Sequence, residues 1–186
     1  MAKAFATLPA TYDDVQAAPP DQIAELVAGL LHLSPRPAIR HARTSSRLGA
    51  RLTRGFDFGE DGPGGWWILD EPEVHLGSDV VVPDLAGWRQ DHLPELPDEA
   101  WISQPPDWAC EILSPSTTRF DRVEKVPLYA REGVGHVWLI DPRSQTLEVL
   151  RLERGRYVIL GSFAGATEVR AEPFDGMALL LGELWG

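Results

Sequence analysis

The chain has 186 residues, of which 44 % are hydrophobic, and this is enough to bury the core of a single domain. Its formal net charge of −11 argues against broad electrostatic adhesion to nucleic acid, because non-specific affinity comes largely from Lys and Arg neutralising phosphates. No run of eighteen apolar residues and no signal-peptide pattern is present, so we expect a cytoplasmic protein with no membrane span.

The first part of the chain predicts a hairpin followed by a helix. We expect residues 1–21 to form an N-terminal extension and residues 22–186 to form one domain. The segments IAELV and LLHLS flank Gly29 and predict two paired strands. A helix is expected from about residue 39 to residue 54, after two prolines.

That helix carries a concentration of positive charge. Six arginines and no acidic residue lie between positions 36 and 54, and the last five fall on one narrow helical stripe. One interpretation is a solvated face, or a face that pairs with acidic residues of a neighbouring subunit. The other is a face that follows nucleic-acid phosphates, for which the candidate residues are Arg40, Arg43, Arg47 and Arg51.

The middle of the chain predicts strands. WWILD is one strand, and SDVVVPDLAGW is a longer strand that contains Pro83. The polar segment RQDHLPELPDEAWISQPP predicts a long loop, and WACEIL predicts a further strand. Cys110, the single cysteine, lies in this strand and is interpreted as a buried packing residue in a reducing compartment.

The last third of the chain predicts a helix and three strands. SPSTTRFDRVEKVPLYAREGVG has helical apolar spacing and ends at Gly133. Pro127 predicts either a kink in this helix or a helix that begins only there. HVWLIDP predicts a buried strand, and TLEVLRL and RYVIL predict an alternating hairpin.

Acidic side chains in the apolar strands are the first candidates for chemistry. Alternation in WACEIL places Glu111 among apolar residues, where a carboxylate needs a partner, a raised pKa or a metal. Asp84 is placed in a similar way just after Pro83. These two carboxylates and the backbone carbonyl of Ile112 would form the oxygen-rich partial shell that Mg²⁺ prefers, or Mn²⁺ in its place.

A lysine supplies the third element of the predicted site. Lysine occurs only twice in the chain, and Lys125 follows Glu111 in the predicted helix. Its ammonium group can offset the charge that builds up on phosphorus during hydrolysis. Asp121 lies four residues earlier and is expected to hold Lys125 in place. The alternative is an ordinary ion pair on a surface helix.

The order of these residues resembles a known family. VVPDLAGW and PDWACEILSPSTTRFDRVEKVPLYAREGVGHVWLIDP, with the weaker AELVAGLLHLSPRPAIRH, resemble the Uma-type restriction-endonuclease-like proteins of the PD-(D/E)XK nuclease superfamily. The likeness extends from about residue 22 to the C-terminus. One position departs from the superfamily signature, because Leu113 stands where the standard motif has lysine. Lys125 on the following helix is the counterpart of that lysine.

The resemblance implies an α/β fold in which a restriction-endonuclease-like mixed β-sheet core, in the order α-β-β-β-α-β, is flanked by helices and added β-hairpins. It implies that Asp84 and Glu111 bind the metal and that Lys125 completes the catalytic set. Glu25 resembles an early acidic residue found in the superfamily. His41 matches a recurrent family histidine, although a capping or packing role is the favoured interpretation for it.

Three classes of function follow from the sequence. The first is a metal-dependent endonuclease that cuts DNA, with RNA as the alternative substrate. The second is a catalytically inactive module on the same fold that binds nucleic acid or protein, and the third is an unrelated metabolic enzyme, for which no cofactor motif is present. A homodimer is expected because two related sites are the simplest way to cut both strands of a duplex.

Overall fold

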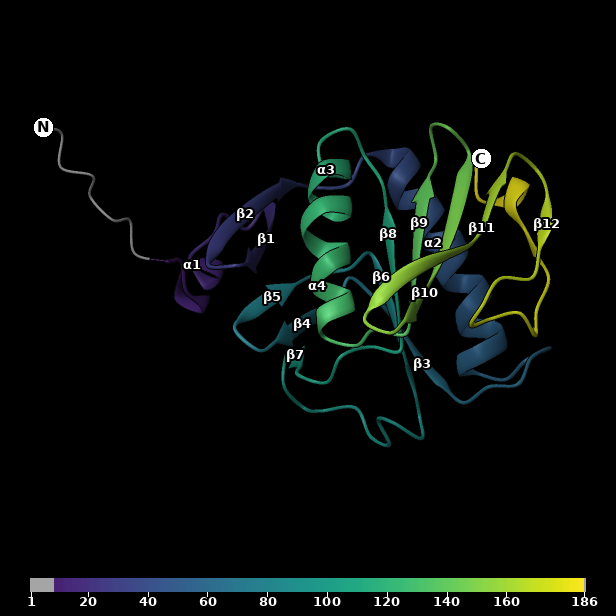
Figure 1. The fold of residues 1–186 in the computed structure, drawn as a ribbon, viewed down its shortest axis with the longest axis horizontal. Coiled ribbons are helices and arrows are strands. Elements are labelled where there is room, and N and C mark those ends of the chain that lie inside the picture. Colours follow the sequence, from purple (N-terminus) through teal and green to yellow (C-terminus); the bar gives the residue numbers. More distant parts are fainter. Residues whose placement is uncertain (1–8, 186) are drawn as a thin grey trace, which may run out of the picture.

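The structure is a computed structural model that describes residues 9–185, so the first eight residues of the expected N-terminal extension lie outside the described part. Its larger sheet has six strands in the order β11-β10-β9-β8-β6-β3 (Figure 1). These strands are β3 (Trp66–Asp70), β6 (Leu85–Arg89), β8 (Trp108–Ile112), β9 (His136–Asp141), β10 (Thr146–Glu153) and β11 (Arg156–Ala164).

A smaller sheet of five strands lies beside the larger one, in the order β2-β1-β5-β4-β7. Its strands are β1 (Gln22–Val27), β2 (Leu30–Pro35), β4 (Glu73–Leu76), β5 (Asp79–Val81) and β7 (Trp101–Ile102). The expected hairpin around Gly29 is confirmed, since β1 and β2 pair in antiparallel register. Strand β4 was not predicted, and β7 lies inside the segment that was expected to be a long loop.

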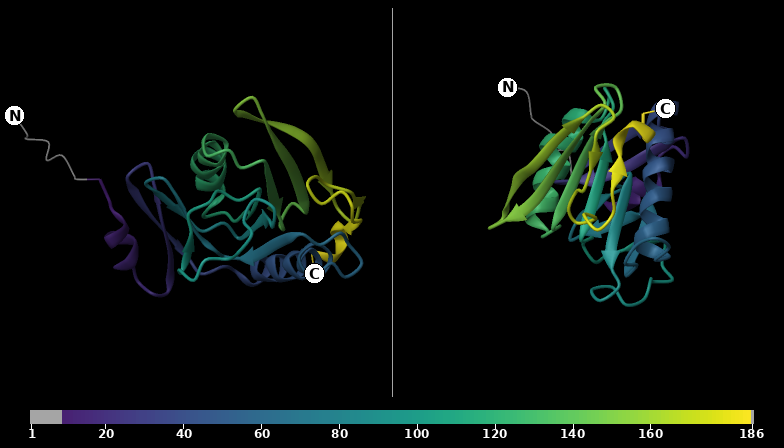
Figure 2. Two further views of the ribbon diagram at one scale, coloured as in Figure 1. Left: turned by 90° about the horizontal axis from the view of Figure 1, so that it is seen from below. Right: turned by 90° about the vertical axis from the view of Figure 1, so that its right-hand side faces the viewer.

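Helices cover both faces of the larger sheet. The helices of the chain are α2 (Ile39–Leu52) and α4 (Val126–Arg131), with the single turn α3 (Thr118–Phe120), the π-helices η1 (Thr53–Asp57) and η2 (Asp121–Lys125), and the 3₁₀ turn η3 (Leu181–Glu183). A further short helix, α1 (Tyr12–Gln16), packs against the smaller sheet instead. Helix α2 lies on one face of the sheet, and the run α3-η2-α4 lies on the other (Figure 2). Within residues 9–185, no helix is both long and apolar enough to span a membrane.

The order α2-β3-β6-β8-α4-β9 reproduces the predicted α-β-β-β-α-β core, so the expected fold class is confirmed. Strand β8 shows why this core forms. Trp108, Cys110 and Ile112 pack on the α2 side, whereas Ala109 and Leu113 pack on the α4 side, as the alternation predicted. Every residue of β8 is buried, and Cys110 is a buried free thiol.

The prediction of one long strand around Pro83 was wrong. The segment divides into β5, which belongs to the smaller sheet, and β6, which belongs to the larger sheet. Pro83 has no N–H group and cannot donate to a strand ladder, so pairing stops at this point. Asp84 therefore lies at the junction of the two sheets, directly before β6.

The helix after β8 starts well before Pro127, at Thr118, and runs to Arg131 through three segments. The five residues before α4, from Asp121 to Lys125, form a π-helix, and the proline sits in the first turn of α4. A proline removes one N–H donor and crowds the carbonyl four residues earlier. The wider π turn that precedes it accommodates this defect while the helix continues.

The C-terminal segment completes the core on the α2 face of the larger sheet. It contains the short strands β12 (Glu168–Val169) and β13 (Leu179–Leu180), which pair with each other. Phe174 is 2 % exposed, and its ring lies 4.6–5.7 Å from the rings of four aromatic residues, which are Phe56, Trp66, Trp108 and Trp138. This contact joins the C-terminal segment to η1, β3, β8 and β9.

Replacing Phe174 with alanine is expected to lower the free energy of unfolding by about 3–5 kcal/mol, because a buried aromatic ring would leave a cavity among four others. Urea unfolding followed by tryptophan fluorescence measures the change. The matched control is Phe58→Ala, since Phe58 is 70 % exposed and its loss is expected to cost no more than about 0.5 kcal/mol. Equal effects of the two substitutions would show that the C-terminal segment does not stabilise the core.

Candidate functional site

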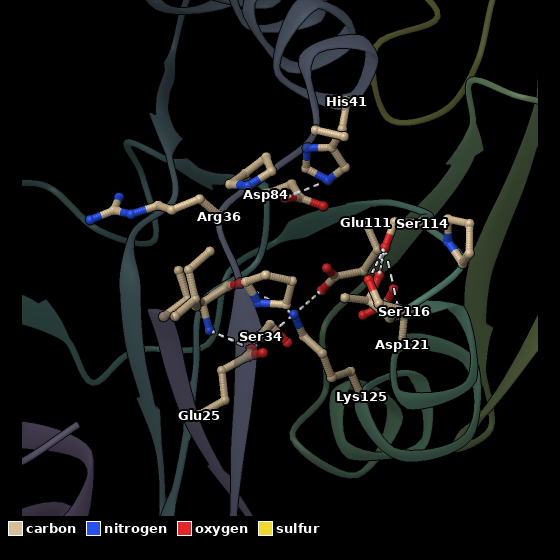
Figure 3. A pocket seen from close by; sticks show the side chains of 17 residues that line it. Glu25, Ser34, Arg36, His41, Asp84, Glu111, Ser114, Ser116, Asp121 and Lys125 are labelled. Carbon is tan, nitrogen blue, oxygen red and sulfur yellow. Dashed lines mark hydrogen bonds and ion pairs between the residues drawn. The ribbon is translucent and has the colours of Figure 1, made fainter. Parts of the chain in front are cut away.

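A cavity of about 180 Å³ opens where the two sheets meet the N-terminal end of α2 and the helix after β8. The smaller sheet contributes Glu25, and the junction between the sheets contributes Asp84. Strand β8 contributes Glu111, and η2 contributes Asp121 and Lys125. The cavity therefore gathers polar side chains from segments that are far apart in the sequence (Figure 3).

Lys125 lies at the centre of this group and is 2 % exposed. Its Nζ atom is 2.9 Å from Glu25 Oε1 and 2.8 Å from Glu111 Oε1, and it donates to the Val82 carbonyl at 3.2 Å. Burial alone would lower the pKa of Lys125, but Glu111 and Glu25 outweigh it and hold the pKa well above its ordinary value. Lys125 is thus a charged ammonium group that joins both sheets to the helix.

Glu111 is held by two donors at one of its oxygens. Its Oε1 atom accepts a hydrogen bond of 2.5 Å from the Tyr129 hydroxyl in addition to the contact with Lys125. Burial raises the pKa of Glu111 well above its usual range, and the charge of Lys125 opposes this rise. Within residues 9–185, Oε2 makes no hydrogen bond, so it is the oxygen that remains for a ligand.

Asp84 is fixed by the strand beside it. Its Oδ2 atom accepts the backbone N–H of Ile112 at 2.6 Å, and its Oδ1 atom is 3.1 Å from His41 Nε2. The break at Pro83 makes this possible, because it turns the chain so that the carboxylate of Asp84 reaches the end of β8. The structure thus brings Asp84, Glu111 and Lys125 of the predicted site together at one cavity, and Ile112 contacts this group through its backbone N–H.

The expected ion pair between Asp121 and Lys125 is a wrong prediction. In the described part of the chain the ion-pair partners of Lys125 are Glu25 and Glu111. The prediction assumed α-helical winding, in which residues four apart lie on one face, whereas the segment is a π-helix. Asp121 still lines the cavity at 4 % exposure, and burial raises its pKa to about 6, opposed by Lys125 and a Thr117 hydroxyl.

His41 and Glu25 lie closer to the site than the sequence suggested. Glu25 Oε1 accepts the backbone N–H of Val82 at 2.9 Å as well as binding Lys125. His41 lines the cavity and contacts Asp84, so the favoured capping or packing role does not describe it. Burial lowers the pKa of His41, but hydrogen bonding and charge from Asp84 outweigh it, so that the pKa is raised.

Sequence reasoning assigned no role to Tyr129, although the structure places its hydroxyl on Glu111. Two signals pointed to it. A carboxylate buried in an apolar strand requires donors, and Tyr129 lies four residues after Lys125 on the helix that covers this strand.

The four arginines of α2 that were predicted to bind nucleic acid are all exposed, but they divide into two groups by their contacts. Arg47 and Arg51 both bind Glu183 of the C-terminal segment, the first through its backbone carbonyl and the second through its carboxylate. Arg40 and Arg43 lie on the first two turns, near the cavity, and have no ion-pair partner among residues 9–185. Positive charge is therefore available mainly at the cavity end of the helix.

The donor set at the cavity fits a hard divalent cation in its chemistry. Four carboxylates, from Glu25, Asp84, Glu111 and Asp121, line it together with one lysine and one histidine. Glu111 has donors on one oxygen only, and Asp84 contacts one backbone N–H and one histidine. Carboxylate oxygens are the ligands that Mg²⁺ and Mn²⁺ prefer. Within residues 9–185, no three His, Cys, Asp or Glu side chains are already clustered as a metal site.

Comparison with known proteins gives a family and a fold. The model of the Uma2 family, described as "Putative restriction endonuclease", matches residues 9–181. A crystal structure of a putative nuclease belonging to DUF820 from Anabaena variabilis ATCC 29413 superimposes with a TM-score of 0.77. It is 21 % identical, and the match covers 95 % of this chain and 98 % of that one, which establishes likeness of fold. No curated protein gives a significant match.

The Asp121→Asn variant is expected to be more stable than the wild type at pH 7 and similar to it near pH 4. The pKa of Asp121 in the folded protein is raised from 3.8 to about 6, so its protonated form favours folding and this contribution is lost as pH rises through about 6. Two pKa units correspond to roughly 3 kcal/mol, which is an upper value for the gain.

Urea unfolding of both proteins between pH 4 and pH 8 measures this difference in stability. Asp98→Asn, a substitution at an exposed position, reports the general effect of removing one negative charge. A difference between the wild type and Asp121→Asn that did not change with pH would contradict the prediction.

Proposed function

The chain belongs to the Uma2 family of putative restriction endonucleases, and on this basis we propose that it is a metal-dependent nuclease that hydrolyses phosphodiester bonds of DNA at this cavity. The observation that carries the proposal is the meeting of two carboxylates and a lysine. Asp84 directly precedes β6, Glu111 lies in the adjacent strand β8, and Lys125 Nζ lies 2.8 Å from Glu111 Oε1. RNA is the alternative substrate.

Asp84, Glu111 and the carbonyl of Ile112 are the proposed holders of Mg²⁺ or Mn²⁺. When bound, such an ion supplies Lewis acidity toward a phosphoryl oxygen and makes water a stronger nucleophile. The Ile112 N–H orients Asp84, and Tyr129 and Lys125 orient Glu111, so neither carboxylate has to be ordered during the reaction.

Lys125 is proposed to stabilise the negative charge that builds up on the phosphate in the transition state. An ammonium group in a site with little water interacts more strongly with such charge than it would in bulk solvent. Glu25 supports this role because it keeps Lys125 charged and positions its side chain. The lysine therefore acts from the helix, whereas the superfamily signature places it on the strand.

The arginines near the cavity are proposed to bind the nucleic-acid backbone. Arg36 lines the cavity itself, and Arg40 and Arg43 continue from it along α2. A local basic surface of this kind is compatible with the net charge of −11, because it allows phosphate binding at the site without general adhesion.

One observation favours the second candidate function, a catalytically inactive binding module. All the hydrogen-bonding capacity of the Lys125 ammonium is used by Glu25, Glu111 and the Val82 carbonyl. The two candidates differ in a single measurable property, which is turnover.

The wild type is expected to nick supercoiled plasmid DNA with Mg²⁺ or Mn²⁺ and to be inactive with EDTA. Asp84→Asn, Glu111→Gln and Lys125→Met are each expected to lower the rate at least about 100-fold, the usual effect of removing one group that stabilises the transition state. Single-stranded DNA and RNA are assayed in parallel. Lack of cleavage of all three substrates by the wild type would favour the binding module.

Two controls make this experiment specific. Glu95→Gln changes an exposed glutamate in the loop before β7 and is expected to retain full activity. Lys125→Met leaves two buried glutamates without their cation, so it is also tested as the double variant Glu25→Gln/Lys125→Met, which removes one of those charges. Cleavage that survives in the variants would indicate a contaminating nuclease.

Arg40→Ala and Arg43→Ala are each expected to weaken DNA binding and to reduce the slope of log Kobs against log salt concentration by about 1, because each arginine binds about one phosphate. Arg51→Ala should have a smaller effect, since Glu183 already neutralises that guanidinium group. Fluorescence anisotropy in the Asp84→Asn background measures binding without cleavage. Equal losses of DNA binding in Arg43→Ala and Arg51→Ala would contradict the division of the α2 arginines into an unpaired group and a group paired with Glu183.

A further inference from the structure

We propose that His41 is a third ligand of the metal site, and that the site therefore selects a first-row transition ion such as Mn²⁺ over Mg²⁺. This inference rests on the proposed function, because it concerns the metal held at Asp84. With His41 as a ligand, the donor set contains nitrogen as well as oxygen, and nitrogen bound to a metal ion can be measured directly.

The geometry brings His41 to the same place as the other donors. His41 Nε2 is 3.1 Å from Asp84 Oδ1, and both residues line the cavity. An imidazole nitrogen from α2 and a carboxylate oxygen from the junction between the sheets thus meet at the cavity wall. Figure 3 shows the His41 ring turned toward Asp84.

The surroundings of His41 do not support a purely structural role. Helix α2 has Ala38 as its N-cap and makes no side-chain capping bond there, so His41 does not cap the helix. The side chain is 11 % exposed, and Nδ1 is buried with no hydrogen-bond partner among residues 9–185. The polar contact of His41 is made through Nε2, which is directed to Asp84 at the cavity wall.

The carboxylates of Asp84 and Glu111 have different partners, and His41 contacts only that of Asp84. Glu111 Oε1 is engaged by Lys125 and Tyr129, so Glu111 offers its other oxygen, Oε2. His41 and Asp84 are already in contact, although in the described residues they form no cluster of three metal-binding side chains. An ion bound at Asp84 would therefore meet the imidazole nitrogen directly.

A nitrogen ligand discriminates between ions of similar charge. Mg²⁺ prefers oxygen ligands in a strict octahedral arrangement, whereas imidazole suits first-row transition ions. A site in which one of the protein donors is imidazole is expected to bind Mn²⁺ more tightly than Mg²⁺, and this preference should disappear when the imidazole ring is removed.

The experiment uses the full chain and measures binding instead of cleavage. Free Mn²⁺ is counted by electron paramagnetic resonance during titration, and Mg²⁺ is measured by competition. Variants are His41→Ala, His41→Gln, which retains a donor toward Asp84, and Asp84→Asn. The control is His92→Ala, because His92 is exposed in the loop after β6. Pulsed electron paramagnetic resonance of the wild type with Mn²⁺ detects the coupling of any bound nitrogen to the ion, and this test does not depend on the variants.

We expect nitrogen coupling in the wild type and its loss in both His41 variants. The Mn²⁺ dissociation constant should rise at least about tenfold in these variants, while that of Mg²⁺ changes less. If Asp84→Asn abolished Mn²⁺ binding while the His41 variants bound normally and the wild type showed no coupling, the inference about His41 would fail and the proposed function would stand. Unchanged binding by Asp84→Asn would overturn both.

Discussion

The burial of Lys125 is the constraint on which the site depends. An ammonium group removed from water loses hydration worth several kcal/mol, which it recovers only with partners of good geometry. Here those partners come from β1 and β8, so the ion pairs tie the smaller sheet, the larger sheet and the covering helix together at one point. Each glutamate in turn has the same cation as its ion-pair partner.

The break at Pro83 is the second condition for this arrangement. An uninterrupted strand would carry the alternation of side chains past position 84 and keep Asp84 within a ladder. Because pairing stops, the chain passes from one sheet to the other, and Asp84 reaches the backbone N–H of Ile112. The carbonyl of Val82, on the other side of the proline, is free to accept from Lys125. A residue unfavourable within strands thus allows both polar contacts.

Local patterns in the sequence were enough to predict much of the fold. Alternation in β8 identified the buried Glu111, and turn residues identified the hairpin of β1 and β2. What could not be predicted depends on contacts between distant segments. The partner of Lys125 on β1 lies a hundred residues earlier in the chain, and Glu183 lies 132 residues after Arg51. The pairing of Asp121 with Lys125 was also predicted wrongly, because the prediction assumed 3.6 residues per turn and η2 is a π-helix.

Glu183 explains how a regular stripe of arginines can have unequal chemistry along its length. The C-terminal segment is anchored by buried Leu181 and Leu184, and this holds Glu183 against the second half of α2. Arg51 is paired there with a carboxylate and has less to gain from a phosphate, whereas Arg40 and Arg43 are exposed and available for the proposed phosphate contacts. The same aromatic core that fixes the end of the chain therefore limits the basic surface to the part of the helix nearest the cavity.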